Sequence, residues 1–234
     1  MDRAPGGGPP PEPGAGTGPV PAAGPGGPPL VVACALGIEK LALRSGGGRS
    51  GAAGPVTVVR TGMGPAQARR TVARTLAAGP WRDAAVIASG FCAGLAPGMH
   101  PGDLIVAEET RDAEGVTACV GTGPLVDALT RALPGRTVHT GPLTGSDHIV
   151  RGPERAALRA GGAIAVDMES AATLRTALAA GARPVAAVRV VVDAPEHELV
   201  RIGTVRGGIS AFRVLRAVLP AFFEWHRSLL LPRR

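Results

Sequence analysis

The stretch LVVACAL, residues Leu30–Leu36, decides the fold class, because later parts of the chain repeat its pattern. It is an uncharged apolar run of strand length, and such runs fit a strand that is covered on both faces. Similar runs alternate with segments that carry apolar or small residues at helical spacing, which predicts an α/β domain with helices on both sheet faces. Strands are also expected at Val56–Val59, Ala84–Ser89, Asp103–Glu109, Thr137–Leu143 and Pro184–Asp193, and helices at Pro65–Ala78, Pro124–Leu133, Asp167–Ala180 and Ser210–Leu231.

The first 29 of the 234 residues have a different composition from the rest. They hold 9 of the 35 glycines and 10 of the 23 prolines, and they lack the apolar core of a signal peptide. Such a segment cannot bury enough apolar surface to fold, so residues 1–29 are expected to be a disordered tail. Residues 30–234 are long enough for a single α/β domain with its own core.

Charge and cysteine content exclude several classes of protein. The net charge is +7, but the 24 arginines and the single lysine are scattered, and aromatic residues make up only 3%. A nucleic-acid binder normally clusters its charge and uses stacking aromatics, so no nucleic-acid partner is expected. The three cysteines are widely spaced, which indicates thiols in a reducing, cytoplasmic compartment and no zinc site. No apolar window approaches the roughly 18 residues of a membrane span.

Candidate binding residues follow the predicted strands, because ligands of open α/β sheets bind outside the carboxyl ends of the strands. Gly62 and Gly64 follow one strand and open a helix, where backbone N–H groups suit an anion. Gly90 follows the next strand and allows close approach of the backbone to a ligand. Asp193 ends a very apolar strand, where burial favours the protonated form that a general acid needs.

Five blocks of the sequence, taken together, resemble the nucleoside phosphorylase and nucleosidase superfamily. The stretch AVDMESAA at Ala165–Ala172 resembles its V-x-M-E-x-x-A signature, and VRVVVD at Val188–Asp193 resembles the segment that closes its active site. The remaining blocks are CALGIE at Cys34–Glu39, TGMG at Thr61–Gly64, and SGFCAGL at Ser89–Leu95 followed by PGDLIV at Pro101–Val106. The resemblance implies one domain with a three-layer αβα fold and a central twisted mixed sheet.

The resemblance also implies a reaction, the cleavage of the bond between ribose C1′ and purine N9. Asp193 would protonate or hydrogen-bond N7 of the departing base, and Glu169 would bind the ribose hydroxyls. The attacking group would be water activated by Glu39, or phosphate held by Gly62 and Gly64. No metal or organic cofactor is implied, with phosphate as the expected co-substrate. Substrate contacts are expected from Met168 under the sugar, from Phe91, Ile149 and Val150 around the base, and from Gly90 and Arg189, the last either orienting Asp193 or screening its charge.

The substrate expected from the resemblance is an adenosine-type compound, and one form of it is linked to a lipid. The segment RVVVDAPEHEL at Arg189–Leu199 and the C-terminal helix look like those of the hopanoid-associated phosphorylases, whose substrate is adenosylhopane. Phe91 and Val192 stand where methylthioadenosine nucleosidases commonly carry serines, which makes the pocket more apolar. The basic amphipathic C-terminal helix suits either packing on the domain or contact with the inner face of the membrane. A homo-oligomer is expected.

Other functions remain open on the sequence alone. One is hydrolysis of methylthioadenosine or S-adenosylhomocysteine, which keeps the chemistry and changes the substrate. Another is a catalytically inactive relative that only binds nucleosides. The presence of both Glu169 and Asp193 argues against the second, because a binding protein has less need of that acid pair.

Overall fold

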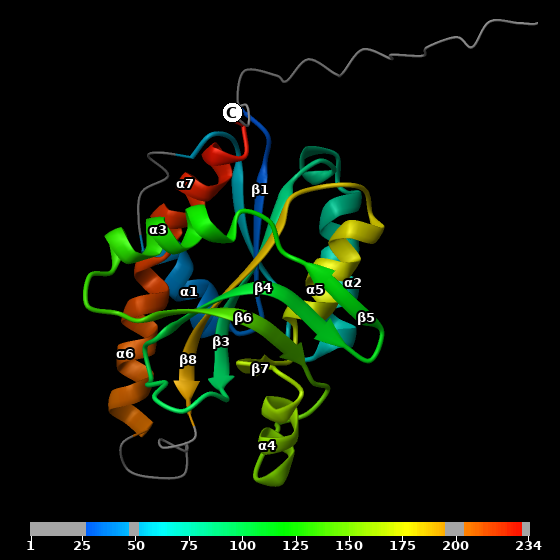
Figure 1. Ribbon diagram of the computed structural model, residues 1–234. Coiled ribbons are helices and arrows are strands. Elements are labelled where there is room, and N and C mark those ends of the chain that lie inside the picture. Colours follow the sequence, from blue (N-terminus) through cyan, green and yellow to red (C-terminus); the bar gives the residue numbers. More distant parts are fainter. Residues whose placement is uncertain (1–26, 47–51, 195–203, 231–234) are drawn as a thin grey trace, which may run out of the picture.

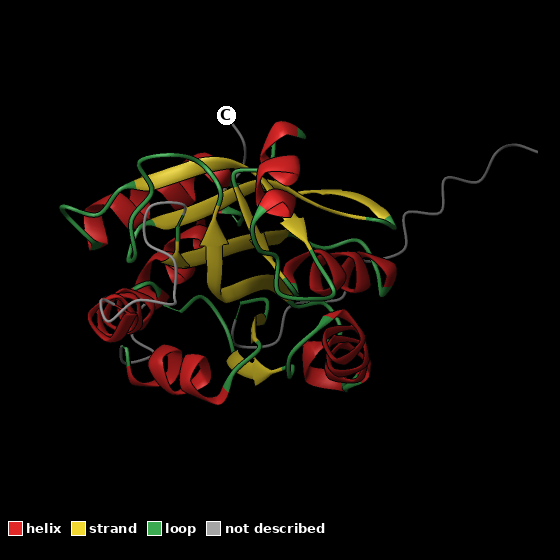
Figure 2. Cartoon of the chain, turned by 90° about the horizontal axis from the view of Figure 1, so that it is seen from below, coloured by secondary structure: helices red, strands yellow, loops and turns green. Residues whose placement is uncertain are grey.

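The computed structural model describes residues 27–46, 52–194 and 204–230, and they form three layers with a mixed sheet in the middle (Figure 1). Most of the predicted tail, residues 1–26, lies outside the described residues, so its disorder stays a prediction. The three-layer α/β arrangement expected from the sequence is confirmed, and Figure 2 shows helices on either side of the strands.

The sheet has eight strands, and five of them form a closed ring. β3 pairs with β7 and β8, β4 pairs with β8 and β6, and β6 pairs with β7, which completes the ring. β1 and β2 extend the sheet beyond β3, and β5 pairs with β4. The strands are β1 Leu30–Cys34, β2 Val56–Arg60, β3 Ala85–Gly94, β4 Leu104–Asp112, β5 Gly115–Ala118, β6 Val138–Gly145, β7 Ala165–Asp167 and β8 Val185–Asp193.

Alternating residues of the buried strands face two separate apolar cores. In β1, Leu30 and Val32 pack toward one core, whereas Val31 and Ala33 pack toward the other. This is the period of two expected of a strand that is covered on both faces. The first core is covered by α1 Gly37–Ser45, α3 Thr122–Ala132, α6 Thr204–Ala217 and α7 Leu219–Ser228, and the second by α2 Pro65–Ala77 and α5 Ser170–Ala179.

The C-terminal segment differs from the single amphipathic helix expected at Ser210–Leu231. It forms two helices, α6 and α7, which meet at Val218, and Pro220 lies in the first turn of α7. Proline lacks the N–H that a continuing helix needs, so it fits the start of a new one. The aromatic side chains Phe222, Phe223 and Trp225 are buried in the first core. They are therefore not available to a membrane surface.

Four short elements were not predicted: α1, β7, β5, in which only Thr117 is buried, and α4 Pro153–Ala160, in which no residue is fully buried. Each has at most nine residues, which is shorter than the window over which apolar periodicity is read. Figure 1 shows α4 at the end of the sheet to which the arrows of β3 and β8 point. In the described parts of the chain, no helix is long and apolar enough to cross a membrane.

Candidate active site

A cleft of about 280 Å³ lies at the carboxyl ends of the strands, where ligands of α/β sheets are expected. Its walls come from segments far apart in the sequence, which follow β1, β2, β3, β6, β7 and β8. All three predicted catalytic carboxylates, on Glu39, Glu169 and Asp193, line it. The predicted contact residues Met168, Phe91, Ile149 and Val150 line it as well, together with Met63 and Val192.

Glu169 is held at the start of α5 in a nearly dry environment. Its side chain is only 7% exposed, and the Gly64 N–H donates a hydrogen bond of 2.8 Å to its Oε1. Burial raises the pKa of Glu169 to about 7, and nearby Asp167 and Glu39 add to the increase, whereas Arg189 and the Gly64 N–H oppose it. Glu169 therefore changes charge near neutral pH, and a shifted pKa of this kind in a cleft marks a candidate functional residue.

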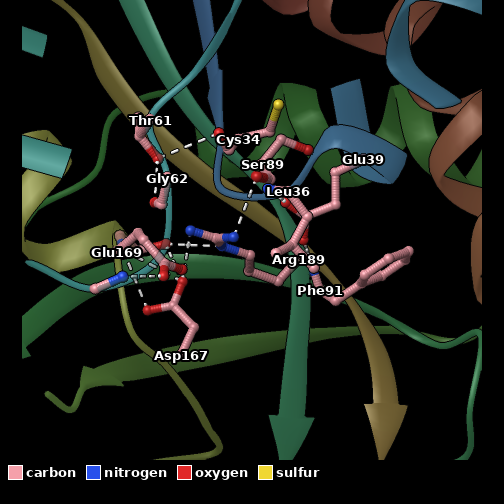
Figure 3. Close-up of polar contacts among 12 residues, drawn as sticks. Cys34, Leu36, Glu39, Thr61, Gly62, Ser89, Phe91, Asp167, Glu169 and Arg189 are labelled. Carbon is pink, nitrogen blue, oxygen red and sulfur yellow. Dashed lines mark hydrogen bonds and ion pairs between the residues drawn. The ribbon is translucent and has the colours of Figure 1, made fainter. Parts of the chain in front are cut away.

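Glu39 is fixed by two backbone donors from different elements. Its Oε2 accepts from the N–H of Leu36, just before α1, and its Oε1 accepts from the N–H of Phe91 in β3 (Figure 3). The residue is 2% exposed but lines the cleft. The turn after β1 is thereby tied to the end of β3, and one carboxylate is presented to the cleft in a fixed orientation.

Arg189 is placed differently from the prediction. It is 1% exposed and lies behind the cleft, where its Nη2 is 2.6 Å from Oδ2 of Asp167. Its Nε donates to Ser170 Oγ and its Nη1 to the backbone oxygen of Ser89 (Figure 3). Arg189 therefore pairs with Asp167 and does not orient Asp193, which corrects the expected contact.

Both the backbone conformation and the close surroundings of Gly90 require glycine at this position. Its φ of +136° lies in the region that favours glycine. A Cβ atom at this position would lie 2.5 Å from Oε1 of Glu39 and 2.7 Å from Nη1 of Arg189. The missing side chain thus makes room for two buried charged groups. A direct substrate contact by Gly90 stays a prediction.

Asp193 ends β8 and is paired with an arginine that sequence reasoning missed. Nη1 of Arg155, from α4, donates to its Oδ2 at 3.0 Å, and the two side chains are 11% and 15% exposed. Arg155 also donates through Nη2 to the backbone oxygen of Gly94. Arg155 stands outside the five blocks that carry the resemblance, so no motif marks it in the sequence.

The glycine turn after β2 has a conformation that suits its glycines, since φ is +86° at Gly62 and +87° at Gly64. Neither residue is among those that line the cleft. The Gly64 N–H, one of the predicted phosphate donors, bonds to Glu169. Phosphate binding at this turn therefore stays a prediction, and it would require that bond to be exchanged.

The remaining walls of the cleft are apolar. Met63 and Ile149 are 67% and 68% exposed, although large apolar side chains are usually covered. His148 lies at the rim and contacts Asp147 and Glu154, whose carboxylates raise its pKa. In the described parts of the chain, no group of three or more His, Cys, Asp or Glu residues could hold a metal ion.

Comparison with known proteins agrees with the fold. The sequence profile of the Phosphorylase superfamily matches residues 48–220. The chain therefore belongs to the Phosphorylase superfamily, and it is an enzyme of the nucleoside phosphorylase and nucleosidase type. No curated protein matched in a search with the whole sequence.

Solved structures of similar fold cover nearly the whole domain. One is a 5′-methylthioadenosine/S-adenosylhomocysteine nucleosidase from Neisseria meningitidis, bound to methylthio-immucillin-A. Its sequence is 20% identical, its TM-score is 0.68, and the match covers 86% of this chain and 99% of that chain. An S-adenosylhomocysteine nucleosidase from Streptococcus pyogenes, bound to 5-methylthiotubericidin, is 20% identical with a TM-score of 0.69 and covers 90% and 100%. At these identities the likeness concerns the fold.

Proposed function

We propose that this enzyme cleaves the N-glycosidic bond between ribose and adenine in an adenosine that carries an apolar 5′ substituent. The observation that carries the proposal is that Glu169 and Asp193, a strand and a helix apart in the sequence, line one cleft at the carboxyl ends of the strands. Bond cleavage needs the departing base to be neutralised and the positive charge on the sugar to be stabilised. One carboxyl group is available for each task.

Each carboxyl group has an environment that suits its task. Asp193 has one oxygen, Oδ1, that is buried and without a hydrogen-bond partner in the structure, and N7 of a bound purine would supply that partner. Glu169, when ionised, would accept hydrogen bonds from the ribose hydroxyls and stabilise the positive sugar. A nearly dry cleft strengthens both interactions, because the local dielectric constant is lower than that of water.

For the 5′ substituent, we propose the hopane group of adenosylhopane, with phosphate as the attacking group and adenine as the product. The exposed side chains of Met63 and Ile149 at the cleft support an apolar substrate, since a lipid chain would cover them. The proposal includes a homo-oligomer in the cytoplasm. Contact with the inner face of the membrane is also proposed. It would have to use exposed apolar side chains such as Met63 and Ile149, because the aromatic residues of α7 are buried.

Hydrolysis of methylthioadenosine or S-adenosylhomocysteine is the second candidate, and two observations favour it. No lysine or arginine lines the cleft within the described residues, and the Gly64 N–H is already bonded to Glu169, so a phosphate would find few donors there. Glu39 lines the cleft and would activate the water molecule. The similar structures from Neisseria meningitidis and Streptococcus pyogenes are nucleosidases by name.

Release of adenine, measured by chromatography, tests the proposal. The protein would be incubated with methylthioadenosine and with detergent-solubilised adenosylhopane, each with and without phosphate. Phosphate-dependent release from adenosylhopane only, together with a sugar phosphate, is the expected result. Phosphate-independent release from methylthioadenosine would establish the nucleosidase instead, and no release from either substrate would contradict both candidates.

A further inference from the structure

We infer that Arg155 is the positioning residue for Asp193, and that it links this carboxylate to the wall of the base pocket. The inference rests on the proposed function, in which Asp193 acts on the departing base. It concerns a residue outside every motif described above. Arg155 does not line the cleft, so it would act through Asp193 and not on the substrate.

The guanidinium of Arg155 donates hydrogen bonds to two neighbouring strands. Nη1 donates to Oδ2 of Asp193 on β8, and Nη2 donates to the backbone oxygen of Gly94 on β3, both at 3.0 Å. The two strands are paired at this point, since Ala93 lies opposite Asp193. A planar guanidinium bound at two points has little freedom to turn, so it fixes the orientation of the carboxylate it holds.

The hydrogen bond from Arg155 uses only one carboxylate oxygen of Asp193. Oδ1 of Asp193 is buried, and no hydrogen-bond partner for it occurs in the described structure. Buried polar atoms without a partner are rare in folded proteins, and those that occur call for an explanation such as a catalytic role. Since Asp193 lines the cleft, a hydrogen bond that Oδ1 in its protonated form donates to N7 of the base would provide that explanation.

Arg155 also ties Asp193 to the segment that carries Ile149 and Val150. This segment lines the cleft and leads directly into α4, the helix that contains Arg155. α4 has no fully buried residue, and apart from the packing of the partly buried Leu158, polar contacts hold it in place. Of those given by the structure, the contacts of Glu154 with His148 and of Arg111 with the Gly161 oxygen are exposed, whereas the Arg155 contacts are partly buried.

It follows that the base pocket and the acid are not independent. A base that shifts Ile149 and Val150 also shifts α4, and Arg155 carries that movement to Asp193. In this arrangement the orientation of Oδ1 would depend on how accurately the base is placed in the pocket, and not only on whether a base is bound. Such alignment effects are large, because a misplacement of about 1 Å costs on the order of a hundredfold in rate.

Kinetics of Arg155 variants test the inference on whichever substrate the wild-type enzyme cleaves. For Arg155→Ala, kcat is expected to fall about tenfold to a hundredfold while KM changes less than about threefold. Arg155→Lys keeps the charge but cannot donate to Asp193 and to the Gly94 oxygen in the fixed geometry of a guanidinium. Its kcat should therefore lie between those of the wild type and Arg155→Ala. The matched control is Arg159→Ala, an exposed arginine on the same helix, which should match the wild type.

The outcomes separate the inference from the proposed function. Wild-type turnover with unchanged kcat in Arg155→Ala would overturn the inference and leave the proposed function intact. An increase in KM with unchanged kcat would also overturn it, because Arg155 would then only hold the pocket wall. If Arg155→Ala does not fold, the Arg155→Lys variant decides in the same way. Absence of wild-type turnover on every substrate would instead refute the proposed function.

Discussion

Two arginine–aspartate pairs anchor the ends of β7 and β8, and they differ in how completely they are satisfied. In the first, Arg189 and Asp167 are each 1% exposed, and Ser170 and the Ser89 oxygen bind their remaining groups. In the second, Arg155 and Asp193 are 11% and 15% exposed, and Asp193 Oδ1 and Arg155 Nε have no partner given by the structure.

The difference separates a structural pair from a pair prepared for a ligand. A buried ion pair is tolerated only when additional hydrogen bonds satisfy its remaining atoms, as they do around Arg189. The pair at Asp193 lacks such satisfaction at Oδ1 of Asp193 and at Nε of Arg155. Asp167 and Asp193 both line the cleft, so under the proposed function it is the unsatisfied oxygen that distinguishes the Asp193 pair. Changes to the first pair should therefore affect stability, and changes to the second should affect catalysis.

The largest effect is expected from Asp193→Asn. An amide cannot donate a carboxylic proton to the base, so kcat should fall by about 10²- to 10⁴-fold, the usual contribution of general acid catalysis. Substrate binding should be largely kept, because the amide retains the shape of the side chain. Adenine release and equilibrium binding are the measurements. Turnover at the wild-type rate would show that Asp193 is not the acid.

Arg189→Met should mainly lower the free energy of unfolding. It leaves Asp167 buried without its partner, and removal of one member of a buried ion pair costs about 3–5 kcal/mol. Urea unfolding measures this cost, with Arg159→Ala as an exposed control that should change stability by less than about 0.5 kcal/mol. A loss below about 1 kcal/mol for Arg189→Met would remove the distinction between the two pairs.

A smaller and graded effect is expected from pH through Glu169. Its pKa is raised to about 7, chiefly by burial, so kcat/KM should rise as pH increases through about 7 and the carboxylate forms. Glu169→Gln should lower activity and remove this rise. The rate profile from pH 5 to pH 9 tests it, and an unchanged profile in the variant would assign the rise to another group.

The same pKa has a consequence of opposite sign for stability. The folded protein holds the Glu169 proton more tightly than the unfolded chain, whose glutamate has a pKa near 4.5. This contribution is therefore fully present below about pH 4.5 and is lost as pH rises through 7. Glu169→Gln should be more stable than the wild type above pH 7, and this gain should be absent at pH 5.

The fold was largely predictable because its strands are apolar runs of the right length. The predicted strands and the helix Pro65–Ala78 correspond to β1 to β4, β6, β8 and α2, but β3 runs on to Gly94, so that Gly90 lies within the strand and does not follow it. Ring closure was not predictable, since β8 pairs with two strands that precede it by many residues. The elements that were missed, α1, β5, α4 and β7, have at most nine residues each, which is too short for a reliable periodic signal.

The site residues that stand in blocks resembling the family could be predicted from the sequence. The contacts that these residues make in three dimensions could not. Glu39, Glu169 and Asp193 stand in recognisable blocks and do line one cleft. Arg189, four residues before Asp193 on β8, would share its face in a regular strand. The register shifts by one residue between them, where Ala93 pairs with Asp193, so the alternation ends before Asp193. The side chains that pair with Arg189 and with Asp193 therefore could not be predicted from the sequence.

The closed ring of strands also determines when the protein is complete during its synthesis. β8 fills the gap between β3 and β4, and it leaves the ribosome roughly 90 residues after β3 has been made. At about 5–20 residues per second, β3 and β4 spend several seconds or more with unpaired edges. Chains that end before Val185 keep those edges permanently, so premature termination should yield aggregates and not a smaller folded enzyme.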